Sequence, residues 1–141
     1  MQPRNKKYNV EGKDAMYFRD AAHKRNFISR VKRNPNKCDN EYLSALYLLT
    51  ADKTLWLSAK KEITNEKIQI EEINIRGISP MGYMFIKVAS DIKEKSTYLS
   101  LADIGDKHLV SNEEFRIIIT ALKISRRGYE VIDCVKKPFM L

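Results

Sequence analysis

The sequence predicts a mainly α fold, a compact bundle of five or six helices with at most a minor two-stranded β element. Apolar residues recur at helical spacing in several stretches, most of these stretches follow a capping residue, and strand-like alternation is confined to residues 67–76. The 141 residues, 43% of them hydrophobic, are enough for the core of one domain. We therefore expect a single helical domain over residues 15–141, preceded by a basic mobile arm over residues 1–14.

Six segments have helical periodicity and are expected to form the helices: residues 21–33, 40–51, 53–65, 80–92, 98–104 and 112–127. Five of them follow a residue that can cap a helix, namely Asp20, Asp39 (or Asn40), Asp52, Ser79 and Ser111. The second segment has almost no polar face, so we expect it to be the central and most buried helix. The last has the clearest bounds, because Ser111 and Glu114 form a capping box and Gly128 ends the periodicity.

Residues 67–76 alternate as a strand would, but Glu71-Glu72 interrupts the register. We expect a short strand or an irregular extended segment there, which could pair with the β-branched residues 129–135. The predicted core is led by ten apolar residues: Leu43, Leu46, Leu49, Trp56, Phe85, Val88, Phe115, Ile118, Ile119 and Leu122.

The net charge of +8 is concentrated in the first quarter of the chain. Residues 1–37 contain 11 basic and three acidic residues, whereas residues 38–141 contain 15 of each. Because a localised positive field attracts phosphate groups or an acidic protein surface, we predict binding to a nucleic acid, or to an acidic protein or nucleoprotein. The alternative is a charge run that only improves solubility. The predicted contact residues are Lys6, Lys7, Arg19, Lys24, Arg25, Lys32 and Arg33.

The chemistry of the sequence gives little indication of an enzyme. It contains neither a Gly-rich phosphate loop nor a nucleophile elbow. The two cysteines (Cys38 and Cys134) and two histidines (His23 and His108) are too scattered for the paired spacing of a zinc site. We expect His23 to be a packed histidine with a satisfied ring nitrogen. The expectation is a protein without metal, cofactor or catalysis, and a small enzyme with an unrecognised site is a third alternative.

The sequence also bears on the compartment in which the protein works. We recognise no secretory signal, and the longest apolar stretch, residues 45–51, is too short to span a bilayer. Widely separated cysteines suit a reducing environment. We therefore expect a cytoplasmic protein that does not enter a membrane.

Residues 100–118 contain a local pattern: a Ser-Leu-Ala-Asp-Ile-Gly run, then Val110-Ser111, then Phe115 and Ile118. This pattern resembles the helix-turn-helix of repressors similar to the lactose repressor. The resemblance implies that a small residue lets the two helices cross closely and that a serine caps the recognition helix. It makes a DNA-binding regulator the second functional alternative. The residues that it singles out are Gly105, Ser111, Asn112 and Arg116.

A broader pattern extends over about residues 16–128. Its elements are Tyr17-Phe18-x4-His23, Glu41-Tyr42-x3-Leu46-Tyr47, Ser79-Pro80 before an apolar helix, and Asn112-Glu113-Glu114-Phe115 before the last long helix. Together they resemble a family of small uncharacterised helical proteins from phages and integrative elements of Gram-positive bacteria. The resemblance implies an accessory gene of a mobile element, and such proteins often bind and modulate host machinery, including defence nucleases. The leading hypothesis is a non-enzymatic binding protein of this kind, acting through its basic N-terminal region as an inhibitor or regulator.

Overall fold

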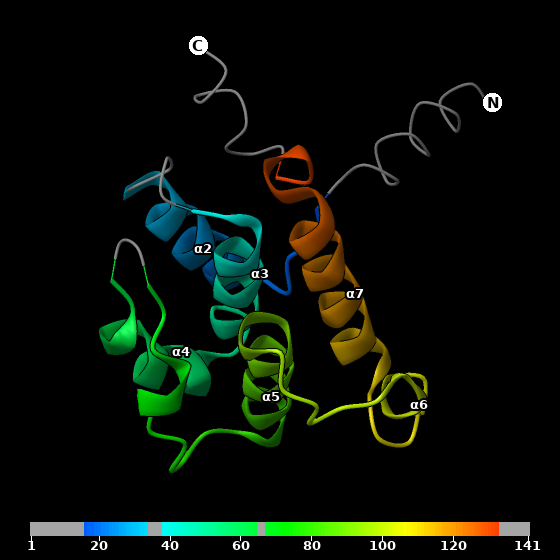
Figure 1. Cartoon of the computed structure of the whole chain (residues 1–141). Helices are drawn as coiled ribbons and strands as arrows, with labels where there is room; N and C mark the ends of the chain where they lie inside the picture. The colour runs from blue at the N-terminus through cyan, green and yellow to red at the C-terminus, as the bar shows by residue number, and fades with distance from the viewer. Residues whose placement is uncertain (1–15, 34–37, 65–66, 133–141) are drawn as a thin grey trace, which may run out of the picture.

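The computed structural model describes residues 16–33, 38–64 and 67–132 (Figure 1). Within these ranges the chain is mainly helical and has no strand, so the predicted fold class is confirmed. The α-helices are α2 (Ala21–Arg33), α3 (Asn40–Leu49), α4 (Lys53–Ala59), α5 (Pro80–Glu94), α6 (Leu101–Ile104) and α7 (Asn112–Arg127). The described residues also form three 3₁₀ helices: η2 (Lys60–Glu62), η3 (Ile70–Glu72) and η4 (Gly128–Glu130). The predicted N-terminal arm lies outside the described residues.

Helix α3 is the centre of the molecule. Every residue from Tyr42 to Leu49 is buried, and the helix contacts α2, α4, α5 and α7 (Figure 1). The prediction of a central, most buried helix is therefore confirmed. Ser44 lies in the middle of this apolar helix and donates its hydroxyl hydrogen to the carbonyl oxygen of Ala121 in α7, at 2.6 Å. This bond satisfies a buried hydroxyl and fixes α7 against α3.

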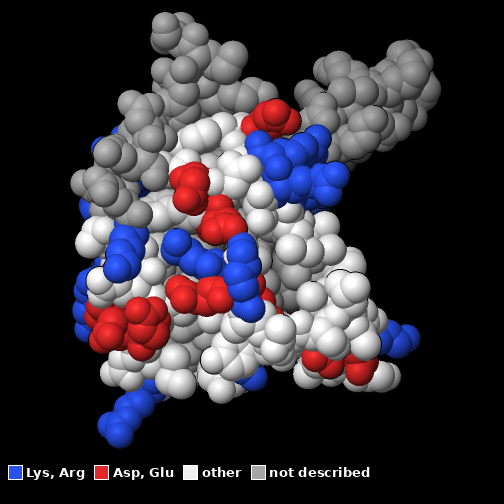
Figure 2. All heavy atoms as spheres, viewed as in Figure 1, with Lys and Arg blue, Asp and Glu red and all other residues white. Residues whose placement is uncertain are grey.

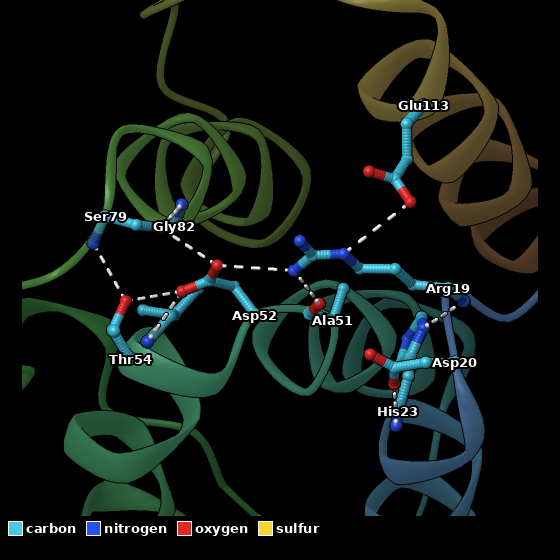
Figure 3. A network of polar contacts seen from close by, with 10 residues as sticks. Arg19, Asp20, His23, Ala51, Asp52, Thr54, Ser79, Gly82 and Glu113 are labelled. Atoms are coloured by element: carbon cyan, nitrogen blue, oxygen red, sulfur yellow. Dashed lines mark hydrogen bonds and ion pairs between the residues drawn. The ribbon is translucent and has the colours of Figure 1, made fainter.

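One carboxylate joins the starts of α4 and α5 (Figure 3). Asp52 caps α4 by accepting the backbone N–H of Leu55, and it also accepts the hydroxyl of Ser79, at 3.0 and 2.9 Å. Ser79 in turn caps α5 by accepting the backbone N–H of Gly82 at 2.9 Å. Gly82 packs closely here, because a Cβ atom would lie 2.8 Å from a carboxylate oxygen of Asp52. The two capping residues expected from the sequence thus form one network.

Of the two alternatives expected for residues 67–76, the structure has the irregular segment and not the strand. In the described part of the chain, pairing is limited to one antiparallel bridge between Ile63 and Ile68. The 3₁₀ turn η3 follows, and because residues three apart eclipse one another in such a turn, Ile70 and Ile73 are both buried. Residues 129 and 130, expected to pair with this segment, belong to η4, and residues 133–135 lie outside the described ranges.

Helix α7 buries a different face from the predicted one. Ile117, Ile118, Ala121 and Ile124 face the core, whereas Phe115 is 41% exposed and Leu122 is 40% exposed. The prediction of a core role is therefore wrong for Phe115 and Leu122, and Ile119 is only half-buried. It is confirmed for the other seven residues: Leu43, Leu46, Leu49, Trp56, Phe85, Val88 and Ile118.

Candidate anion-binding groove

A groove of about 560 Å³ separates α2 from the segment formed by α4 and η2. We call it the α2–α4 groove. Its apolar lining includes Trp56 and Leu57, and Leu57 is 53% exposed. Four basic residues and one acidic residue line it as well: Arg19, Arg25, Lys53, Lys60 and Asp20. The groove therefore combines an apolar surface with an excess of positive charge, as expected of a site for an anionic group.

Arg25 lines this groove, and it is one of several cations that α2 directs outward because of the way in which the helix packs. His23, Phe27 and Val31 are buried against the core, which directs the remaining side chains outward. Four of the outward residues are exposed cations: Lys24, Arg25, Lys32 and Arg33. The ion pairs found between described residues involve only Arg19 and Lys95 among the cations, so these four charges are uncompensated there. Lys32 follows Arg25 by seven positions, which places the two on one side of α2, about 10 Å apart along its axis.

Arg30 fixes the position of α2 relative to η2. Its guanidinium lies over the ring of Trp56, 5.2 Å from the centroid, and donates hydrogen bonds to the carbonyl oxygens of Lys60 (3.0 Å) and Ile63 (3.4 Å). These contacts hold one wall of the α2–α4 groove against the other. Arg30 is therefore a cation with a structural role, unlike the exposed cations of α2.

Arg19 lines the groove, yet its charge is offset within the protein (Figure 3). Its guanidinium donates to the carbonyl oxygen of Ala51 at 3.1 Å and pairs with Asp52 at 3.5 Å. Its Nε atom also lies 3.6 Å from a carboxylate oxygen of Glu113, at the start of α7. Among the predicted contact residues that the structure describes, Arg19 is thus the one whose charge is paired within the protein. Lys6 and Lys7 lie outside the described residues.

His23 borders the groove but has both ring nitrogens engaged. Its side chain is buried, its Nδ1 atom accepts the backbone N–H of Arg19 at 3.0 Å, and its Nε2 atom lies 2.8 Å from the carbonyl oxygen of Tyr47. Since that carbonyl only accepts, Nε2 must carry the proton. Burial lowers the pKa of His23 from 6.5 to about 4, so the ring is neutral near pH 7. The expected packed and satisfied histidine is confirmed.

Two residues of the groove were not predicted from the sequence. Lys53 and Lys60 come from α4 and η2, in a stretch whose charges balance when they are summed over residues 38–141. Their relevance depends on the packing of α4 beside α2, which local sequence does not encode. The signal that could have revealed them is the Lys53, Lys60, Lys61 series, because these lysines recur at roughly helical spacing.

The structure agrees only in part with the helix-turn-helix that the resemblance implies. Ser111 caps α7 in a capping box with Glu114, as predicted. The close helix crossing expected at Gly105 is wrong, because an added Cβ would meet only carbonyl oxygens of its own turn, the nearer at 3.5 Å. Helix α6 is a single turn of four residues. Asn112 is exposed, and the guanidinium of Arg116 lies 4.1 Å from the ring centroid of Tyr17.

Other kinds of site find little support in the described ranges. These residues contain no group of three His, Cys, Asp or Glu side chains that could hold a metal ion. Cys38 is buried, which raises the pKa of its thiol, and Cys134 lies outside the ranges. None of the helices placed by the structure is long and apolar enough to cross a membrane. Comparison with protein-family models, with curated proteins and with solved structures finds no match to this chain.

Proposed function

We propose that this chain is a non-enzymatic binding protein that engages a polyanion through the α2–α4 groove and the adjoining cations of α2. The partner class that we favour is nucleic acid, either free or within a host nucleoprotein such as a defence nuclease. The observation that carries the proposal is the set of four exposed, uncompensated cations on α2, of which Arg25 lines a groove together with Lys53 and Lys60. The resemblance to phage and mobile-element proteins supplies the setting.

The chemistry of these cations favours phosphate groups. Arginine presents a planar fork of donors that matches a phosphate, and lysine contributes a compact positive charge. Cations at the spacing of Arg25 and Lys32 reach phosphates along a backbone without reading base edges. We therefore expect binding that depends little on nucleotide sequence and strongly on salt, because each neutralised phosphate releases counterions.

A matched pair of variants tests the proposal. The first replaces Lys24, Arg25, Lys32 and Arg33 with alanine; the second makes the same change at Lys67, Arg76, Lys107 and Lys123, four exposed cations elsewhere. The two variants have equal net charge, so they separate local contact from overall attraction. Fluorescence anisotropy of a labelled random-sequence duplex, measured over a range of salt concentrations, is the readout.

We expect the α2 variant to bind at least about tenfold more weakly and the control variant to stay within about threefold of the wild type. The slope of log affinity against log salt should become shallower by about 0.9 for each phosphate contact removed. Equal losses in the two variants would contradict the proposal. Sequence-specific binding that Asn112→Ala or Arg116→Ala abolishes would instead support the DNA-binding regulator.

Capture from a host lysate, with and without nuclease treatment, separates the two kinds of partner. Nucleic acid as the direct partner predicts that captured proteins are lost after nuclease treatment. A protein that survives the treatment and is lost with the α2 variant would identify an acidic protein surface instead.

A further inference from the structure

Helix α7 is apolar on two opposite sides, and the fold uses only one of them. Ile117, Ala121 and Ile124 face the core, whereas Phe115 and Leu122 are exposed. At 3.6 residues per turn, Phe115, Ile119 and Leu122 fall within about 60° of each other, on the side away from the core. We call these three residues the α7 outer stripe. A surface helix needs one apolar face for folding, so a second one indicates another contact.

More apolar surface lies beyond the N-terminal end of the stripe. Leu101 in α6 is 87% exposed and Leu109, in the turn before α7, is 46% exposed. Figure 1 shows α6 beside the N-terminal end of α7. The exposed leucines thus add apolar surface near the N-terminal end of α7.

The charges beside the stripe are segregated. Arg116, Lys123 and Arg127 lie on one edge, about 80° to 120° around the helix from Phe115. The opposite edge carries Glu114, whose carboxylate already accepts the backbone N–H of Ser111. Figure 2 shows Lys and Arg side chains gathered over the C-terminal part of α7. Lys123 and Arg127 are exposed, and neither belongs to an ion pair within the described ranges.

This charge pattern disfavours a second, antiparallel copy of the chain as the occupant. A twofold axis between two antiparallel α7 helices brings each edge against the same edge of the other copy. Arg116 and Lys123 of both copies would then lie together, and like charges at an interface oppose binding. Residues 1–15 and 133–141 each carry more basic than acidic residues, so their charge is equally unsuited to the basic edge.

We propose that the α7 outer stripe binds an amphipathic helix of a partner protein, and that this helix has an acidic edge. Its apolar residues would pack on Phe115, Ile119 and Leu122 at the spacing of successive helical turns. Its carboxylates would face Lys123 and Arg127. This interaction goes beyond the proposed binding of a polyanion, because it uses another helix and needs apolar contact as well as charge.

A pair of synthetic peptides tests this inference. One has leucine at helical spacing with glutamate along both edges, and the other has lysine in place of every glutamate. Anisotropy of each labelled peptide is measured against the full chain and against three variants: Leu122→Gln, the double change Lys123→Glu with Arg127→Glu, and the α2 alanine variant. Circular dichroism checks that each variant remains folded.

We expect the acidic peptide to bind saturably and the lysine peptide to bind at least about tenfold more weakly. Leu122→Gln should weaken binding of the acidic peptide about tenfold, and the double charge reversal should transfer the preference to the lysine peptide. The α2 alanine variant should bind the acidic peptide within about twofold of the wild type, which separates this surface from the α2–α4 groove.

Four results would overturn the inference. The first is absence of saturable binding by the acidic peptide, and the second is equal binding of both peptides. The third is a concentration-dependent dimer in sedimentation velocity that Leu122→Gln dissociates, because it would make a second copy the occupant. A loss of acidic-peptide binding in the α2 variant alone would likewise assign the peptide to the groove.

Discussion

The buried ring of His23 shows how single hydrogen bonds determine a protonation state. The backbone N–H of Arg19 needs a lone pair on Nδ1, and protonation of this nitrogen would remove the acceptor. The hydrogen bond from Arg19 to the ring of His23 therefore forms only while the ring is neutral. Since Arg19 of that segment also contacts Asp52 and Glu113, the protonation state of one histidine affects how α2, α4 and α7 are joined.

Acid should destabilise the protein through His23. Its pKa is about 4 in the folded protein against 6.5 in an unfolded chain, so its stabilising contribution is complete above pH 6.5 and is lost as the pH falls through 4. The expected loss of unfolding free energy is about 3 kcal/mol. Urea unfolding between pH 6.5 and pH 4 measures it. A His23→Gln variant should show a shallower dependence, and the same slope in both proteins would contradict this account.

Asp52 is the residue whose removal should cost most among the caps. Burial alone would raise its pKa, but hydrogen bonds from Thr54, Leu55 and Ser79 and the charge of Arg19 together lower it. We expect Asp52→Ala to lower the free energy of unfolding by about 3 kcal/mol, because the cap and several buried donors lose their acceptor together. Asp103→Ala, at the more exposed cap of α6, is the control and should cost about 1 kcal/mol or less. Urea denaturation compares the two, and equal costs would show that the network adds nothing.

At the scale of elements, helix starts could be predicted and helix faces could not. Asp39, Asp52, Ser79 and Ser111 cap their helices as expected, because capping depends on residues within one turn. The face that α7 buries depends on contacts with α3, a distant segment. Both sides of α7 are apolar, so periodicity alone could not choose between them.

The opposite faces of α7 should respond differently to substitution. Ile117→Ala and Ile124→Ala should each lower the free energy of unfolding by about 2 to 4 kcal/mol, because they leave cavities in a packed core. Phe115→Gln and Leu122→Gln should change it by about 0.5 kcal/mol or less, because these side chains are already in contact with water. Chemical denaturation of the four variants measures these changes. The reverse ranking would mean that the outer stripe faces the core.

At the scale of the molecule, the position of the charge excess along the chain was easier to predict than the tertiary contacts of the charged side chains. The excess over residues 1–37 correctly pointed to exposed cations on α2. It could not reveal that Arg19 is offset by Asp52 and Glu113, or that Lys53 and Lys60 line the same groove as Arg25. Both facts arise from tertiary contacts between segments that are far apart in the sequence.

The central position of α3 leads to a prediction for the whole molecule. Since α2, α4, α5 and α7 all pack on α3, the described helices share one core and should unfold together. Trp56, the single tryptophan, reports on α4 through its fluorescence, whereas circular dichroism reports on all helices. We expect coincident urea transitions by the two methods in the wild type. Leu46→Ala, in the middle of α3, should shift both transitions by the same amount, equivalent to a loss of about 2 to 5 kcal/mol in the free energy of unfolding. Separate transitions by the two methods would mean that α4 and α2 form a unit independent of α7.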